Sequence, residues 1–432
     1  MNLRTLSFSL PLILVIVALS ACATRAAPDA AWQQRMRDGT TATASGDQAK
    51  AESAWRSALE LGTALNPHGP EHAASLAALA DCLAARGDAQ AENVYRQAIS
   101  ACAEAFGADD HNAVTCRDGL ARVLVTRQAF DEAAVVLREA LAIRERTLGP
   151  EHTDTAYSRA MLADVLRAAG RGADAEPLYR QALATWQTLG GNAINRISAE
   201  HGLAQILIAN RDLAGTRQAL QRALALCDEH TAPALRVQLL SELAVACAHS
   251  GDLPAAEAAA REALARAEAA TSTSSIELVP ILDGLTRILA AAGRLDEADA
   301  TISRAIALSE PHPEQIASLL ALRVQLLATA KRWPAAIAAN TRLLNLLERS
   351  TGTDNRDYVG ALNQLIALHT AAGAFAEAAE LNQQAIAIVE RTLGSKDPNL
   401  ATALRNGAEL LRRAGKADAA SLYERRAQAI SP

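Results

Sequence analysis

The chain has 432 residues, of which half are hydrophobic but only 3% are aromatic. Most of the apolar residues are Ala and Leu, which favour helices, and runs of Val and Ile that could build a sheet are scarce after residue 17. The formal net charge of −6 argues against a concentrated basic surface, and so against nucleic acid as a main partner. One ordinary core rarely holds so long a chain, whereas an array of repeats escapes that limit because each repeat packs only against its neighbours.

Residues 1–21 have the pattern of a signal peptide. Arg4 precedes an apolar run from Leu10 to Leu19, which is too short for a membrane-spanning helix. The segment Leu19-Ser20-Ala21-Cys22 then resembles the lipobox of bacterial lipoproteins, in which the leader is removed and the cysteine receives lipid. The resemblance implies a covalent lipid on Cys22. The alternative is an ordinary leader that contains a cysteine by chance.

The residue after the cysteine bears on where the protein is held. In Gram-negative lipoproteins, Asp at that position favours retention at the inner membrane, whereas this chain has Ala23. The resemblance therefore implies an exported protein, anchored in the outer membrane and facing the periplasm. Residues 22–30 would form the lipidated N-terminus and a short tether that keeps the rest of the chain close to the membrane.

From residue 31 to 432 the sequence repeats with steps of 38 to 42 residues. One position of the repeat is alanine in nine of the ten copies, and Thr216 is the exception. The position seven residues later is also alanine in nine copies, and Leu343 is the exception there. In each copy an apolar helical segment precedes a turn, often with glycine, and a second helical segment follows. Loops with helix breakers, such as Gly149-Pro150, separate the copies. The pattern predicts about ten antiparallel helical hairpins.

Two of these hairpins depart from the pattern. The first has Asp38 and Gly39 at core-like positions, and the eighth has Lys331 in place of the turn glycine, so we expect both to be irregular. The hairpins are predicted at residues 31–70, 71–110, 111–152, 153–192, 193–230, 231–273, 274–313, 314–354, 355–397 and 398–432.

The repeat resembles the tetratricopeptide repeat, in the variety of about 42 residues found in kinesin light chains. Residues 162–190 are close to that family's consensus, and residues 148–152 and 393–398 match its loop between repeats. The resemblance implies an all-α fold, a right-handed α-solenoid with a concave groove lined by the first helix of each hairpin. It also implies that the groove binds a peptide or a helix of a partner protein.

The register of the repeat places polar side chains on the predicted groove. Asp118 and Arg122, and likewise Asp283 and Arg287, are four residues apart on first helices and can form ion pairs worth only ~0.3–0.5 kcal/mol when exposed. These side chains could clamp a partner, or they could form a solvated face of self-paired charges. The predicted partner-binding residues are Asp118, Arg122, Tyr157, Asp164, Arg167, His201, Gln205, Gln238, Asp283, Arg287, Gln325, Asn363 and Arg405.

The sequence contains no catalytic or nucleotide-binding motif of the HExxH, P-loop, GxGxxG or GxSxG kinds. The histidines fall in separate repeats, a poor arrangement for metal ligands. We therefore expect no enzyme, no metal, no cofactor other than the lipid, and no small-molecule substrate. Cys102 and Cys116 flank one loop and could form a disulfide in an oxidising compartment; alternatively, they are small buried residues in place of alanine.

Together these patterns predict a membrane-anchored scaffold or assembly adaptor of the cell envelope whose partners are other envelope proteins. Two alternatives stay open at this point. The array could associate with copies of itself as a structural envelope protein, or its groove could bind a solute or a glycan. The sequence does not identify the partner.

Overall fold

The computed structural model describes residues 30–227, 233–270, 275–310 and 312–430. These residues form twenty α-helices and one short 3₁₀ segment, and no strand occurs among them, which confirms the all-α prediction. The chain divides into two compact units, an N-terminal unit of residues 1–227 and a C-terminal unit of residues 228–432.

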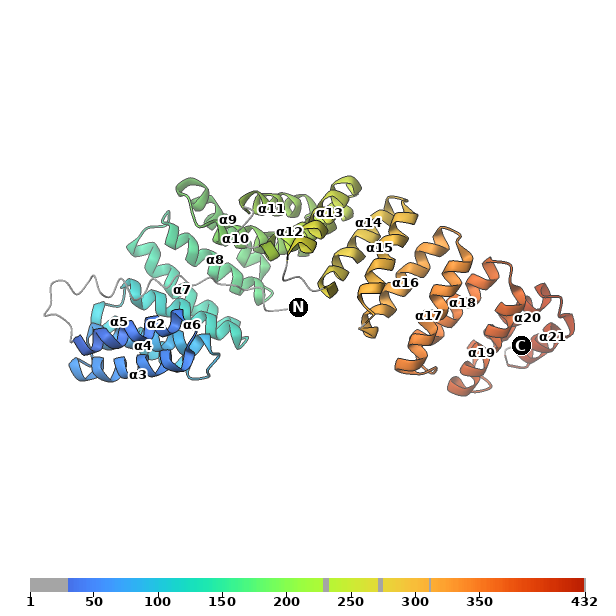
Figure 1. Ribbon diagram of the computed structural model, residues 1–432, viewed down its shortest axis with the longest axis horizontal. Helices are drawn as coiled ribbons and strands as arrows, with labels where there is room; N and C mark the ends of the chain where they lie inside the picture. Colours follow the sequence, from blue (N-terminus) through green and yellow to red (C-terminus); the bar gives the residue numbers. More distant parts are fainter. Residues whose placement is uncertain (1–29, 228–232, 271–274, 311, 431–432) are drawn as a thin grey trace. The chain divides into compact units, whose positions relative to one another are not determined.

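In the N-terminal unit the helices follow one another as five hairpins, shown in blue to green in Figure 1. The first helices of these hairpins are α2 (Ala30–Ala44), α4 (Pro70–Ala85), α6 (His111–Thr126), α8 (Thr153–Ala168) and α10 (Ala193–Ala209). The second helices are α3 (Gln48–Leu65), α5 (Ala91–Phe106), α7 (Phe130–Thr147), α9 (Gly172–Leu189) and α11 (Leu213–Leu226).

The C-terminal unit also contains five hairpins, with the 3₁₀ segment η2 (Ser275–Leu278) before the second of them. The first helices are α12 (Pro233–His249), α14 (Val279–Ala291), α16 (Pro313–Thr329), α18 (Arg356–Ala371) and α20 (Pro398–Arg413). The second helices are α13 (Leu253–Ala269), α15 (Leu295–Leu308), α17 (Trp333–Thr351), α19 (Phe375–Leu393) and α21 (Ala417–Ile430).

Both alanine positions that define the repeat are buried in all ten hairpins, and Thr216 and Leu343, which replace alanine, are buried too. A small side chain at these positions lets the second helix approach its neighbours closely, and a substitution that adds volume there would have to displace packed atoms. Each second helix contacts both the first helix of its own hairpin and, within a unit, the first helix of the next. The alanine register therefore specifies the stacking of the hairpins.

Every hairpin turns through one residue with a positive φ angle. Seven of these residues are the glycines that the sequence placed there, and the other three are Gln128, Arg211 and Lys331, with φ of 62°, 61° and 55°. The left-handed conformation costs an L-residue roughly 1–2 kcal/mol. The expected irregularity of the first and eighth hairpins is wrong, because Gly39 makes room for the Trp55 ring and Lys331 adopts the conformation of the missing glycine.

The predicted signal peptide, Cys22 and all but the last residue of the tether lie outside the described residues. Among the helices that the structure does describe, none has the combination of length and apolar character that a membrane span requires. The same described ranges contain no group of three or more His, Cys, Asp or Glu side chains that could hold a metal ion.

Candidate partner-binding surface

The first helices carry the residues predicted to bind a partner. In the N-terminal unit, α2 contacts α4, α4 contacts α6, and α8 contacts α10, so these helices lie next to one another. Equivalent positions of hairpins two to five hold Asp81, Arg122, Asp164 and Gln205. We call these four residues the polar row.

A tyrosine from the second helix of the same hairpin holds each aspartate of the polar row. The Tyr95 hydroxyl donates a hydrogen bond to Asp81 Oδ1 at 2.5 Å, and the Tyr179 hydroxyl donates one to Asp164 Oδ1 at 2.5 Å. Burial raises the pKa of both aspartates, and the hydrogen bond from the tyrosine partly offsets that rise. Burial likewise raises the pKa of Tyr95 and Tyr179, so both phenols stay protonated and remain donors.

The same two tyrosines also connect consecutive hairpins. Tyr95 packs against Gly119 of α6, and Tyr179 packs against Gly202 of α10. A Cβ atom at either glycine would overlap the tyrosine side chain, which could not move away without leaving its aspartate. Each glycine is therefore required by the residue that it faces rather than by its own backbone conformation.

Arg122 lies beside Asp81, with Nη2 and Oδ1 3.9 Å apart, and it does not pair with Asp118 as predicted. Asp118 is only 6% exposed and pairs with Arg144 of α7 at 2.7 Å. Arg144 also donates to the Ser158 hydroxyl of α8 at 2.5 Å. The expectation that Asp118 is a groove residue is thus wrong, because a cation from the next helix draws its carboxylate inside.

The polar row continues into a hydrogen-bonded group in hairpins four and five. Arg167 donates to the Tyr179 hydroxyl at 3.3 Å and to Gln205 Oε1 at 2.7 Å. Gln205 Nε2 lies 3.1 Å from Nε2 of His201, a residue that the sequence placed on the groove but that is buried. The partly buried Tyr157 lies near the charges of Asp118 and Arg122, and burial raises its pKa. Most of the predicted N-terminal residues are therefore held by one another.

In the C-terminal unit the predicted residues lie closer to the solvent. Asp283 and Arg287 form the expected pair, with Oδ2 and Nε 2.9 Å apart, and the Arg287 side chain is 61% exposed. Gln238 donates to Glu242 one turn along the same helix at 3.1 Å. The three remaining predicted residues are exposed; they are Gln325, Asn363 and Arg405.

The family assignment agrees with this architecture. Residues 127–188 in the N-terminal unit and 357–432 in the C-terminal unit match the family model of the tetratricopeptide repeat. The chain carries tetratricopeptide repeats in both of its units. Such repeats are scaffolds for protein–protein interaction and are generally without enzymatic activity. No curated protein matches this chain in sequence.

Several solved tetratricopeptide structures are similar to this chain. A signal transduction ATPase with a tetratricopeptide repeat sensor from Pyrococcus horikoshii is 12% identical, with 86% of this chain and 55% of that one covered, at a TM-score of 0.51. A putative kinesin light chain from Podosopora anserina is 23% identical, with 46% of this chain and 96% of that one covered, at a TM-score of 0.40. BtubC (BKLC) from P. vanneervenii is 23% identical, with 52% of this chain and 90% of that one covered, at a TM-score of 0.38.

Cys102 of α5 and Cys116 of α6 are buried free thiols that lie side by side in neighbouring tetratricopeptide hairpins. A hydrogen bond between the two thiols, and then burial, raise the pKa of Cys116 well above its usual range. Both observations favour the protonated thiols of small buried residues. A disulfide between them stays a prediction, because their closeness would permit it.

Sequence reasoning missed the residues that organise the N-terminal tetratricopeptide hairpins. Asp81, Tyr95, Tyr179 and Arg144 were not among the predicted site residues, although they fix the positions of several that were. One signal could have found the tyrosines. Tyr95 precedes Gly119 by 24 residues and Tyr179 precedes Gly202 by 23, so a bulky residue is matched twice with a glycine in the next hairpin.

Proposed function

We propose that this chain is a membrane-anchored scaffold or assembly adaptor of the cell envelope, and that its first helices hold a peptide or a helix of another envelope protein. The observation that carries the proposal is the polar row with its supporting hydrogen bonds. Asp81, Arg122, Asp164 and Gln205 occupy one position in four consecutive tetratricopeptide hairpins. Tyrosines fix two of these groups, so both carboxyl groups are held in place on the first helices before a partner arrives.

A polar surface whose side chains are already fixed favours binding, because little side-chain entropy is lost when a partner arrives. Arg122 and Arg167 keep 21% and 18% of their side chains exposed while their carboxylate neighbours hold them. In the C-terminal unit the exposed Arg287, Asn363 and Arg405 extend the range of polar groups that a partner can meet. Arginine is common at the centres of interfaces, so we expect polar, salt-sensitive binding.

The membrane anchor in this proposal rests on the resemblance of residues 19–22 to a lipobox. One acyl chain gives marginal membrane binding, whereas the two or three chains of a processed lipoprotein hold a protein durably. The short tether would keep the hairpins near the membrane, where the partners of the scaffold would also be found. The lipid-bearing residue is Cys22, and the compartment proposed is the periplasmic side of the outer membrane.

The groove assignment is tested by affinity capture from envelopes after mild crosslinking, with the full-length protein as bait. The test bait carries Arg122→Glu from the polar row and Arg287→Glu from the C-terminal unit, both on first helices. The control bait carries Arg180→Glu and Arg304→Glu, the same change of charge on the exposed second helices. A partner that the wild-type and control baits capture, but the test bait loses, supports the proposal. Partners captured equally by all three baits would place binding elsewhere.

The anchor is tested separately with Cys22→Ser. We expect the wild-type protein to incorporate radiolabelled palmitate and to partition into the detergent phase, and the variant to do neither. A wild-type protein that takes up no label and partitions into the aqueous phase contradicts the anchor. That result would not affect the capture experiment, because the palmitate test concerns Cys22 and the capture test concerns the first helices.

A further inference from the structure

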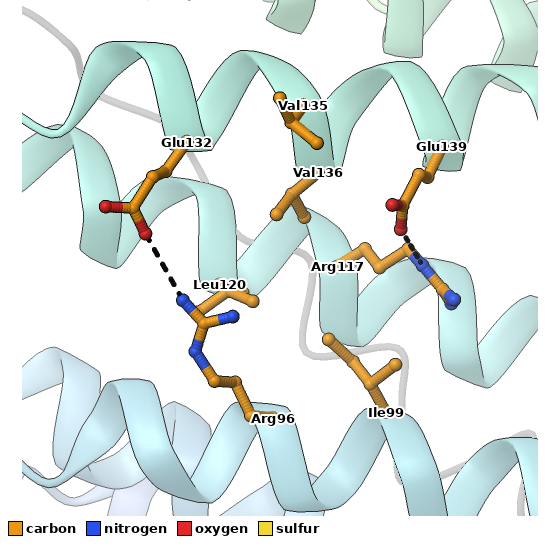
Figure 2. A pocket seen from close by; sticks show the side chains of 8 residues that line it. All are labelled: Arg96, Ile99, Arg117, Leu120, Glu132, Val135, Val136 and Glu139. Carbon is orange, nitrogen blue, oxygen red and sulfur yellow. Dashed lines mark hydrogen bonds and ion pairs between the residues drawn. The ribbon is translucent and has the colours of Figure 1, made fainter.

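A cleft opens between the second helices of hairpins two and three (Figure 2), and none of the residues proposed to bind a partner lines it. It has a volume of about 430 Å³, with α5 and α7 as walls and α6 beneath. The lining residues are Arg96, Ile99, Arg117, Leu120, Glu132, Val135, Val136 and Glu139.

The middle of the cleft is apolar. Ile99, Leu120 and Val136 line it, and the Val135 side chain on the α7 wall is 54% exposed. Water contact with this surface is unfavourable, and covering it would contribute to association. An apolar strip alone does not identify its occupant; the charges on either side of it do.

Both acidic side chains of the cleft lie on one wall. Glu132 and Glu139 lie on α7, whereas Arg96 on α5 and Arg117 on α6 lie opposite, as Figure 2 shows. Arg96 approaches Glu132 at 3.4 Å and Arg117 approaches Glu139 at 3.4 Å, both long for an ion pair. Glu132 and Glu139 remain 65% and 59% exposed. The α7 wall is thus acidic, and both of its acids can still accept hydrogen bonds. The α5 wall presents Arg96, which also contacts Glu92 of its own helix at 3.0 Å.

We propose that this cleft is a contact surface between two copies of the chain, related by a two-fold axis that runs along the cleft. Such an axis exchanges the walls but keeps each end of the cleft in place. Glu132 then faces Arg96 of the second copy, whereas Arg117 stays on the floor of the cleft beside Glu139 of its own chain. Val135 meets the apolar wall that contains Ile99.

The positions of these charges select this arrangement. A two-fold axis across the cleft would place Glu132 over Glu139 of the second copy, which like charges oppose. A foreign helix would need matched acidic and basic edges at the same spacing, whereas a second copy supplies them by symmetry. The cleft is smaller than a standard interface, so we expect a dimer with micromolar affinity. This dimer goes beyond the proposed function, since no residue of the polar row lines the cleft.

The test is sedimentation velocity on the full-length protein over a wide concentration range, with three samples: Glu132→Arg, Arg96→Glu, and an equimolar mixture of the two. In either variant alone, both symmetric contacts join like charges, and self-association should weaken at least tenfold. In the mixture each reversed charge faces an opposite one, so the dimer should return with an affinity near that of the wild type. Far-ultraviolet circular dichroism checks that both variants are folded.

A matched control lies at the equivalent positions of hairpins six and seven, where Arg261 and Glu297 are 3.3 Å apart. Glu297→Arg and Arg261→Glu should leave self-association unchanged. A wild-type protein that stays monomeric at the highest concentration overturns the proposal and assigns the cleft to a different partner. A mixture that remains monomeric, or a control pair that dissociates the dimer equally well, overturns the proposed geometry.

Discussion

The segment Asp-Gly-Leu-X-Arg occurs once in each unit, at residues 118–122 and 283–287, and at the same position of the repeat. In the N-terminal unit Asp118 is buried against Arg144, and Gly119 lies against Tyr95. In the C-terminal unit Asp283 pairs with Arg287 near the surface, and Gly284 faces open space.

The difference comes from other helices. The position of Arg144 is occupied in the C-terminal copy by Ser309, and the position of Tyr95 by Ala260. Without a buried cation the carboxylate turns to its own helix, and without the aromatic ring the glycine has no neighbour to accommodate. Four matching residues in a matching helix thus take different environments, because the residues that decide lie 24 and 26 positions away in sequence.

The largest expected effect comes from removing the two aspartates. Asp118→Ala leaves Arg144 buried without its counter-ion, which typically costs ~3–5 kcal/mol of unfolding free energy. Asp283→Ala removes an exposed pair and should cost no more than ~0.5 kcal/mol. Urea unfolding of both variants, followed by circular dichroism, measures the difference. Equal losses would mean that the two copies of the segment share one environment.

The two glycines should respond to alanine with opposite signs. Gly119→Ala forces a Cβ into the Tyr95 ring and should destabilise the N-terminal unit by ~1–3 kcal/mol. Gly284→Ala adds a methyl group in open space and should stabilise its helix by ~0.5–1 kcal/mol, because alanine favours helix. Thermal melts of the two variants make the comparison.

A double variant identifies the cause of the first loss. Tyr95→Leu removes the ring that collides, so it should make Gly119→Ala less costly than it is in the wild-type background. Strictly additive effects of the two changes would show that the ring is not what the new methyl group meets.

Acid should act in opposite directions on two sites, Asp164 in the N-terminal unit and Glu257 in the C-terminal unit. The pKa of Asp164 is raised above 3.8, so its contribution to stability is complete below that value and falls as the pH rises through the raised pKa. Hydrogen bonds from Arg261 and Arg294 lower the pKa of Glu257 below 4.5, so its contribution is present above that value and is lost as the pH falls through the lowered pKa.

Hydrogen exchange measured from pH 7 to 3, corrected for the intrinsic rates, follows both units in one sample. We expect α13 and α15 to lose protection at higher pH than α8 and α9. Asp164→Asn, which cannot ionise, should flatten the pH dependence of α8 and α9 alone. If α8 and α9 lost protection at a higher pH than α13 and α15, the expected order of the two sites would be wrong.

The smallest effect should be the same in both units. Arg211 and Lys331 hold the left-handed turn position in the N-terminal and C-terminal units, respectively. Replacing either with glycine removes the conformational penalty and should stabilise the fold by up to ~1 kcal/mol. Scanning calorimetry of Arg211→Gly and Lys331→Gly tests this. A gain in stability for only one of the two variants would show that the free-energy cost of the turn residue depends on more than its backbone conformation.

The hairpins could be predicted from sequence because their signals are local or strictly periodic. The buried alanines recur at a fixed step, and a turn residue with positive φ follows each first helix whether or not it is glycine. The environment of a polar side chain is not periodic. Asp118 and His201 share a position with Asp283 and Asn363, yet the first two are buried and the others are not, since each depends on a neighbouring helix.

The contact of each tyrosine with a glycine of the following hairpin has a consequence for how such an array can be copied or recombined. A segment cut at the hairpin boundaries separates Tyr95 from Gly119 and Tyr179 from Gly202, and it sets the ring against whatever residue the new neighbour supplies. A segment that begins with a second helix and ends with the next first helix keeps the two together. In this part of the chain, the segment that can be moved without breaking these contacts is therefore shifted by one helix from the hairpin that the sequence repeat defines.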